Sequence, residues 1–160
     1  MTRTSAILCV AAALSLSGVC AASAEKWTML EEQEVSINYG NDPLKASLSV
    51  TCSARQSEIY VAAAPGTKPP AQAPALVVKE GAVTNTIKLE AYECGRPAAC
   101  SHRPDGEVPT YFARTKGKAM ALRFAEKMTA AEIDAPGAKV SVVRDASVFK
   151  RFAAACRKWK

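Results

Sequence analysis

The stretch "SVFKRFAAACRKWK", residues 147–160, decides the fold that this sequence predicts. Apolar side chains recur in it at intervals of three or four residues: Phe149, Phe152, Cys156 and Trp159. This spacing is typical of one face of an α-helix, so we expect the chain to end in a helix with a cysteine on its buried face. Asp145 or Ser147 can cap the start of the helix by accepting a hydrogen bond from a free backbone N–H group.

The expected partner of Cys156 lies in "KASLSVTC", residues 45–52. Apolar and polar side chains alternate strictly along this stretch, which is typical of a half-buried antiparallel strand, and Cys52 is on the apolar side. Because both cysteines face the core, we expect a Cys52–Cys156 disulfide. It would close a loop of about 105 residues, for which chain entropy gives up to about 4–5 kcal/mol.

Period-two patterns and turn residues predict further strands along the chain. We expect them at 35–39, at 58–63, on both sides of Gly81 within 75–94, as a hairpin about 116–118 within 110–127, and at 138–145. Thr129 to Glu132 matches a capping box, which predicts one helical turn ended by Pro136 and Gly137. The expected fold is mainly β: a single antiparallel β-sandwich or barrel-like domain with the C-terminal α-helix packed on it and two disulfides.

The first 24 residues predict a signal peptide. A single basic residue, Arg3, precedes a short apolar run that ends in Ala22-Ser23-Ala24, the small-x-small pattern of a cleavage site. The run is too short for a membrane span of about 20 residues, and no later segment is apolar enough to provide one. We therefore expect cleavage after Ala24, a single domain from 25 to 160, and a periplasmic or secreted product. Lipidation at Cys20 is the less favoured alternative.

Export decides which cysteines remain in the chain and favours their oxidation to disulfides. Two of the six leave with the signal peptide, and the others stay: Cys52, Cys94, Cys100 and Cys156. An even number in an oxidising compartment predicts two disulfides, so a second bridge is expected to close the short loop from Cys94 to Cys100.

No motif for catalysis, a cofactor or a metal is found. Structural zinc takes four ligands in close pairs, whereas this chain has wide cysteine spacing and a single histidine, His102. Ser101 and Asp105 lie near that histidine in sequence, but no nucleophile-elbow motif is present. The acidic run from Glu31 to Glu34 is expected to be a solvated edge. We expect a protein that is not an enzyme and that uses no cofactor.

Charge is distributed unevenly along the chain. Residues 25–94 hold six Lys or Arg against nine Asp or Glu, whereas residues 95–160 hold fourteen against six. A basic half attracts anionic partners within about 10 Å at ordinary salt. Without aromatic-basic interleaving, a nucleic-acid partner is not expected. The predicted binding surface consists of basic side chains: Arg96, Arg103, Arg114, Lys116, Lys118 and Arg123.

Three stretches of the second half together resemble a known family: "CGRPAAC", "GKAMALRF" and "VSVVRDASVFKRFAAAC". They are similar to the C-terminal part of the invasion-associated locus B family, which comprises small exported proteins of alphaproteobacteria linked to host-cell entry or envelope function. In that family a close cysteine pair precedes a strand that begins near a glycine, and a strand followed by a Phe- and Ala-rich helix ends the chain. The resemblance covers about the last 65 residues and brings no catalytic residue with it.

The leading hypothesis is a non-enzymatic exported protein that binds an anionic protein or envelope component through its basic C-terminal half. One alternative is a periplasmic inhibitor of a hydrolase, resembling lysozyme inhibitors, which would insert the Cys94–Cys100 loop and its Arg96 into a cleft. A second alternative is a cryptic hydrolase that uses Ser101 or His102. The oligomeric state stays open.

Overall fold

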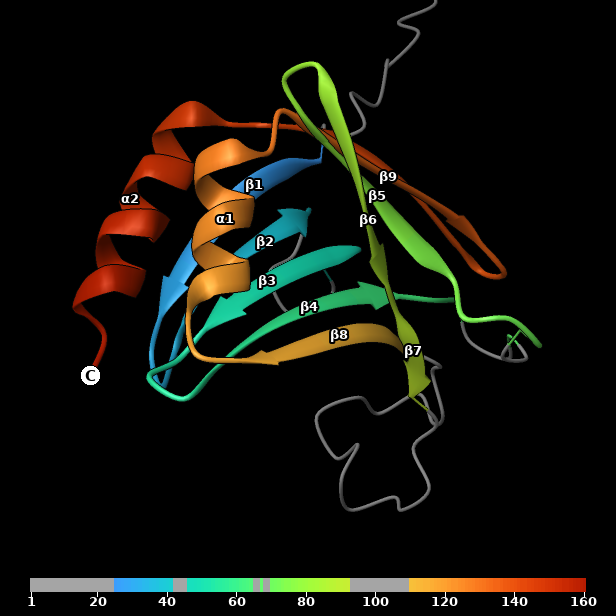
Figure 1. Cartoon of the computed structure of the whole chain (residues 1–160), viewed down its shortest axis with the longest axis horizontal. Coiled ribbons are helices and arrows are strands. Elements are labelled where there is room, and N and C mark those ends of the chain that lie inside the picture. The colour runs from blue at the N-terminus through green and yellow to red at the C-terminus, as the bar shows by residue number, and fades with distance from the viewer. Residues whose placement is uncertain (1–24, 42–45, 65–66, 68–69, 93–109) are drawn as a thin grey trace, which may run out of the picture.

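A computed structural model describes residues 25–41, 46–64, 67, 70–92 and 110–160. The strands of the described residues form two antiparallel sheets (Figure 1). The larger sheet has the order β1-β2-β3-β4-β8-β7. Its strands, in that order, are Lys26–Glu31, Val35–Gly40, Leu48–Cys52, Gln56–Ala62, Thr110–Lys116 and Glu90–Tyr92.

The smaller sheet has the order β10-β9-β5-β6. Its strands, in that order, are Ala138–Val143, Ala130–Ala135, Ala75–Glu80 and Val83–Lys88. Two helices complete the described part of the chain: α1 spans Ala119–Lys127 and α2 spans Ala146–Lys158. The expectation of a mainly β fold with a C-terminal helix is confirmed.

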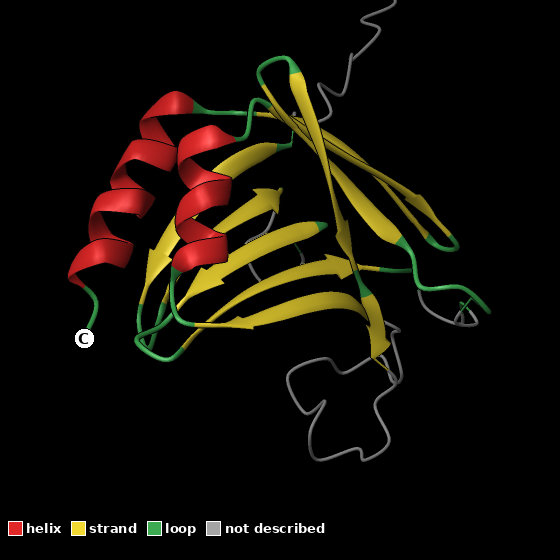
Figure 2. Ribbon diagram, viewed as in Figure 1, coloured by secondary structure: helices red, strands yellow, loops and turns green. Residues whose placement is uncertain are grey.

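The two helices lie side by side on one face of the six-stranded sheet (Figure 2). That face carries the apolar positions of the alternating strands, such as Val50 and Cys52 of β3 and Ile59 of β4, all fully buried. Apolar side chains from the helices and from both sheets join in one buried cluster. Burial of this shared surface stabilises the fold, at about 25 cal/mol for each Å² of apolar area removed from water.

The predicted disulfide between Cys52 and Cys156 is confirmed. It joins the last residue of β3 to the last turn of α2, with the two Cα atoms 5.7 Å apart and a separation of 104 positions in sequence. Phe149 and Phe152 are also fully buried, while Trp159 is half-buried at the edge of the core. The helical face predicted from the terminal stretch is therefore the face that packs on the sheet.

A strand that the sequence analysis did not anticipate, β1, forms the edge of the large sheet next to β2. Its Trp27 indole N–H donates to the carbonyl of Val143 at the end of β10, at 2.8 Å. The same ring packs edge-on against Phe149 of α2, with the centroids 4.8 Å apart. Trp27 thus connects an edge strand to the smaller sheet and to the terminal helix.

The hairpin predicted about residues 116–118 is wrong. Strand β8 ends at Lys116, Gly117 turns the chain with a φ of 71°, and α1 follows. The buried side chains beyond the turn recur at helical intervals: Ala121, Phe124, Ala125 and Met128. Alanine, methionine, leucine, arginine, glutamate and lysine all favour helices, and they make up most of α1. The stretch "GKAMALRF", which the family resemblance places in a strand, is therefore mainly helical.

The helical turn predicted from Thr129 is also wrong, because Ala130–Ala135 is strand β9. Ala131 and Ile133 are buried, the intervening Glu132 is exposed, and β9 pairs with both β10 and β5. The Thr129 hydroxyl donates to the Lys79 carbonyl in β5 instead of capping a helix. Pairing on both sides provides more hydrogen bonds than one isolated helical turn can.

Asp145 is the N-cap of α2. Its carboxylate accepts hydrogen bonds from the backbone N–H groups of Ser147 and Val148, at 2.9 and 3.1 Å. The Ser147 hydroxyl also donates to it, and these bonds hold the pKa of Asp145 below its usual range. The prediction of a cap at Asp145 or Ser147 is thus confirmed for Asp145.

Replacement of this cap gives a pH-dependent effect. D145A should lower the unfolding free energy by about 1 kcal/mol at neutral pH. Because the folded-state pKa is depressed, the contribution is fully present above the unfolded carboxyl pKa of about 3.9 and is lost as pH falls below it. Thermal unfolding of both proteins should therefore differ at neutral pH and converge in strong acid. D134A, which removes an exposed carboxylate of β9, is the matched control; a constant difference for D145A across this range would contradict the prediction.

Several expectations lie outside the described residues: the signal peptide at 1–24, the Cys94–Cys100 bridge, and the Ser101–His102 pair. No helix in the described part of the chain is long and apolar enough to cross a membrane.

Candidate anion-binding surface

Two of the predicted binding residues, Arg96 and Arg103, lie outside the described residues. The other four do not form one patch. Arg114 is in β8, Lys116 ends that strand, Lys118 precedes α1, and Arg123 is within α1. Their contacts show which of them are available to a partner.

Arg114 is paired with an acidic neighbour on the adjacent strand. Its Nε donates to the Glu58 carboxylate in β4, which also accepts hydrogen bonds from the Tyr60 hydroxyl and from the Gln56 side chain. The Glu58 side chain is only 6% exposed, although that of Arg114 is 55% exposed. Burial raises the pKa of Tyr60, and the nearby carboxylate raises it further. Arg114 therefore neutralises a buried acid rather than offering a free charge.

Lys118 is occupied at the end of the terminal helix. Its ammonium group donates to the backbone carbonyls of Arg157, at 3.4 Å, and of Trp159. A cation at this position satisfies carbonyl groups that have no partner within the helix and suits the negative end of the helix dipole. Its role in this structure is to hold α2 next to the start of α1.

Arg123 makes a two-pronged ion pair with Glu80 of β5, with N···O distances of 2.8 and 3.1 Å. Hydrogen bonds from Arg123 hold the pKa of Glu80 below its usual range. Lys116 is exposed and makes no ion pair with a described residue. Of the four predicted residues in the described chain, only Lys116 is a free cation.

The terminal helix presents a denser group of cations. The outward face of α2 carries six side chains, all exposed: Ser147, Lys150, Arg151, Ala154, Arg157 and Lys158. We call the four cations among them the α2 basic stripe. Residues 146–160 contain no acidic residue. The two cation pairs of the stripe are seven residues apart, or about 10 Å along the helix axis.

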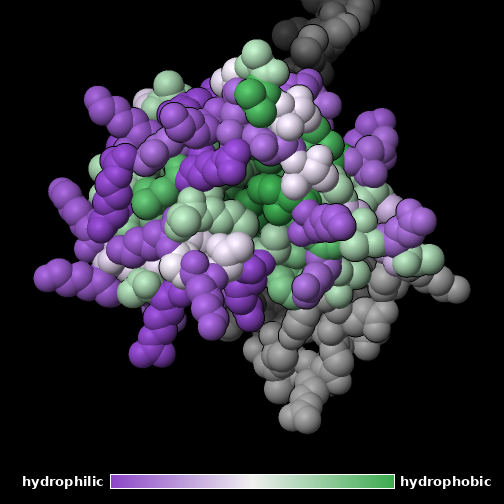
Figure 3. Space-filling view, viewed as in Figure 1, coloured by the Kyte–Doolittle hydropathy of each residue, from purple (hydrophilic) through white to green (hydrophobic). Residues whose placement is uncertain are grey.

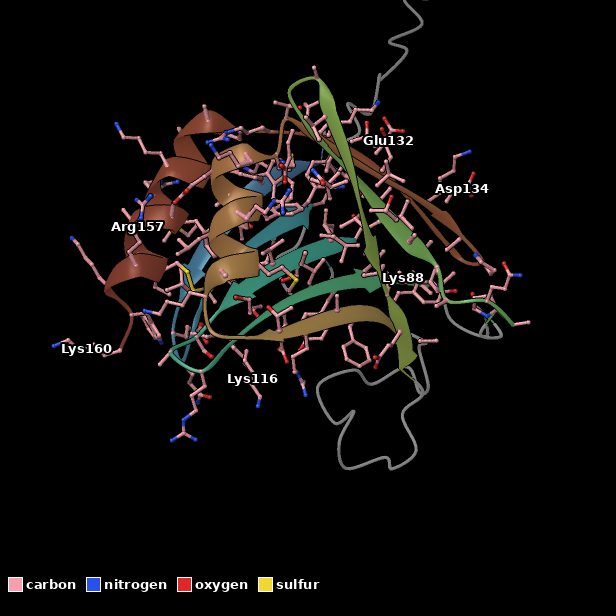
Figure 4. All side chains as sticks on the ribbon, viewed as in Figure 1. Lys88, Lys116, Glu132, Asp134, Arg157 and Lys160 are labelled. Atoms are coloured by element: carbon pink, nitrogen blue, oxygen red, sulfur yellow. A yellow bond between two sulfur atoms is a disulfide. The ribbon has the colours of Figure 1, made fainter. Side chains whose placement is uncertain are left out.

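Three members of the stripe have no acidic side chain within ion-pair distance among the described residues: Lys150, Arg151 and Lys158. The fourth, Arg157, is paired with Glu126 of α1 and is labelled in Figure 4, with Lys160 beyond it. Hydrophilic side chains project from this side of the molecule in Figure 3. These cations were not among the binding residues predicted from the sequence, although their common helical face and the lack of acidic residues beside them indicate such a surface.

The alternatives to anion binding, namely a metal site, an inhibitor and a hydrolase, have little support in the described residues. They contain no group of three His, Cys, Asp or Glu side chains that could hold a metal ion. The residues on which the inhibitor and hydrolase alternatives depend, within 94–105, lie outside the described chain. Comparisons with models of protein families, with curated protein sequences and with solved structures give no match to this chain.

Proposed function

We propose that this is a non-enzymatic exported protein, periplasmic or secreted, that binds an anionic protein or envelope component through its basic C-terminal half. The observation that carries the proposal is the α2 basic stripe, a solvent-facing helix side whose charges are all positive. A rigid helix anchored by a disulfide holds these charges in place, so binding does not require ordering of the backbone.

The charge pattern supports an electrostatic partner rather than an apolar one. Large apolar side chains are scarce on the described surface, where only Val83 and Val143 are strongly exposed. Neither of these lies on α2. Several cations on one helix face attract an anionic surface over about 10 Å, and salt weakens this attraction.

Charge reversal on the stripe tests the proposal. The triple variant K150E/R151E/K158E should elute from a heparin matrix at much lower salt than the unaltered protein, and should lose sedimentation with vesicles that contain anionic lipid. Arg157 is left in place because it is paired with Glu126. Retention on both probes unchanged by the triple substitution would refute the stripe as the binding surface.

The matched control is K26E/K88E/K139E, which changes the net charge equally but at exposed positions on three strands. Lys88 lies on the opposite side of the molecule from Arg157 in Figure 4. If retention depended on net charge alone, both triple variants would lose it equally. A selective loss in the α2 variant supports a defined surface.

The proposal includes three finer features expected from the sequence: cleavage after Ala24, a sandwich-like pairing of the two sheets, and a second disulfide between Cys94 and Cys100. The small-x-small motif supports the cleavage site, the even cysteine count supports the second disulfide, and the one buried cluster shared by the two sheets supports their pairing. The resemblance to the invasion-associated locus B family suggests an envelope or host-contact role. Peptide mapping without reductant, together with N-terminal sequencing of the exported protein, should find both bridges and a chain that begins at Glu25.

A further inference from the structure

A partly enclosed cavity of about 400 Å³ lies between α1 and the β5–β6 hairpin. Its volume is within the range of small-molecule sites, about 300–1,000 Å³. Apolar side chains contribute to its wall: Val78, Ile87, Met120 and Phe124. In Figure 3, hydrophobic surface is visible between α1 and β6 with hydrophilic side chains around it. The cavity can therefore take the apolar body of a small ligand.

Asn85 of β6 supplies an unused donor to this cavity. Its side-chain amide nitrogen is shielded from solvent and makes no hydrogen bond, and the residue is part of the cavity wall. The amide is near enough to Glu80 to help lower the pKa of that carboxyl, but not at hydrogen-bonding distance and angle. A buried polar donor without an acceptor destabilises the folded chain, and a ligand acceptor that reaches it would remove that cost.

The start of α1 adds further donors at the same cavity. Ala119 and Met120, the first residues of the helix, are in the wall. The preceding Lys118 makes no side-chain cap, and the first turn has no acidic residue. The first backbone N–H groups of a helix have no partner within it, and together with the helix dipole they favour an anion.

Charged side chains at the cavity give it a net positive balance. Its wall contains two cations, Lys116 and Arg123, and one acid, Glu80. Because Arg123 pairs with Glu80, the ammonium of Lys116 is the charge that has no opposite partner among the described residues. These are the two predicted binding residues that the fold brings together, although Lys116 ends β8 and Arg123 lies in α1.

We propose that this cavity binds a small amphiphilic carboxylate, with its apolar chain against Met120 and Phe124 and its carboxylate facing Lys116 and accepting from Asn85, whose shielded amide turns toward the ligand. The apolar wall selects the chain, and the donors and the positive balance select the anionic head. The site is separate from the α2 basic stripe and does not depend on the proposed function.

The experiment uses decanoate as the probe and the exported chain, residues 25–160, with its disulfides intact. Calorimetric titration should show saturable binding. In ¹H–¹⁵N spectra, the Asn85 side-chain amide and the backbone amides of Ala119 to Ala121 should shift with the same saturation curve. Decyltrimethylammonium, which has the same chain and a cationic head, and butyrate, which has the head and a short chain, should both bind at least about tenfold more weakly, about 1.4 kcal/mol.

Two variants test where decanoate binds. N85D replaces the donor by a carboxylate of nearly the same shape and should weaken decanoate binding at least about tenfold, the factor that corresponds to about 1.4 kcal/mol. K116Q should weaken it less and reduce the preference over decyltrimethylammonium. If N85D fails to fold, as judged by circular dichroism, K116Q and the spectra of the unaltered chain decide the test.

Three results would overturn the assignment: no saturable binding of decanoate, equal binding of the cationic amphiphile, or shifts confined to α2 and abolished by K150E/R151E/K158E. The last result would place the anion on the stripe and leave the proposed function standing. Conversely, loss of heparin retention with normal decanoate binding would separate the two sites.

Discussion

Loss of the Cys52–Cys156 bridge is expected to lower the free energy of unfolding by about 4 kcal/mol, because the bond closes a loop of about 100 residues in the unfolded chain. Whole domains of this size are stable by about 5–15 kcal/mol, so the double variant C52A/C156A should lose a large part of its stability. Both sulfur atoms lie in the fully buried core, where alanine also leaves unfilled space. Urea unfolding without reductant measures the effect.

The control uses a background in which Cys94 and Cys100 are alanine, so that added reductant acts on this bond alone among the cysteines of residues 25–160. Reductant should then shift the urea midpoint toward that of the variant lacking all four cysteines. A midpoint unaffected by reductant would show that the bond does not stabilise the folded chain.

The second large effect is expected at Phe149, for which F149A should cost about 3–5 kcal/mol. The ring is fully buried at the point where β1, α1 and α2 meet. It packs edge-on against Trp27, lies 6.0 Å from the Phe124 ring, and carries the Arg144 guanidinium over its face at 5.5 Å. Alanine would remove all of these contacts and leave a cavity that the disulfide-tethered helix cannot readily close.

Urea unfolding of F149A should show the lowered midpoint, and Trp27 fluorescence should report a more solvated indole in the folded state. K150A is the matched control, because it changes the next residue of the same helix, whose side chain is exposed. Its effect should stay within about 0.5 kcal/mol. Equal losses for F149A and K150A would mean that helix content, rather than core packing, sets the stability.

Helix α2 and strand β3 could be predicted because their burial follows a simple period. The chain alternates strictly into Cys52 and places Phe149, Phe152 and Cys156 at helical intervals, so the facing of each cysteine follows from local geometry. The same reasoning failed at Thr129, where a capping-box pattern is outweighed by sheet pairing with β5 and β10. It also failed after Gly117, where short apolar runs fit a strand and a helix equally well.

The binding surface predicted from the sequence shows a different limit of sequence-based prediction. Lys116, Lys118 and Arg123 are close in sequence, but Lys116 ends β8, Lys118 precedes α1 and Arg123 lies within it, and long-range contacts give two of them fixed partners. Those partners, the end of α2 and Glu80, are 39 or more residues away in sequence. No local pattern could have indicated which lysine or arginine stays free.

By itself, the sequence determined the strand periods, the terminal amphipathic helix, the disulfide between Cys52 and Cys156, and the excess of positive charge in the second half. Tertiary structure alone decided that β1 is held by Trp27, that Ala130–Ala135 is a strand, which cations are neutralised, and that Asn85 lies beside α1 at a cavity. The physical reason is the separation in sequence between the residues that set each property. Periodicity and charge are properties of neighbouring residues, whereas burial, ion pairing and cavities arise from contacts between segments that only folding brings together.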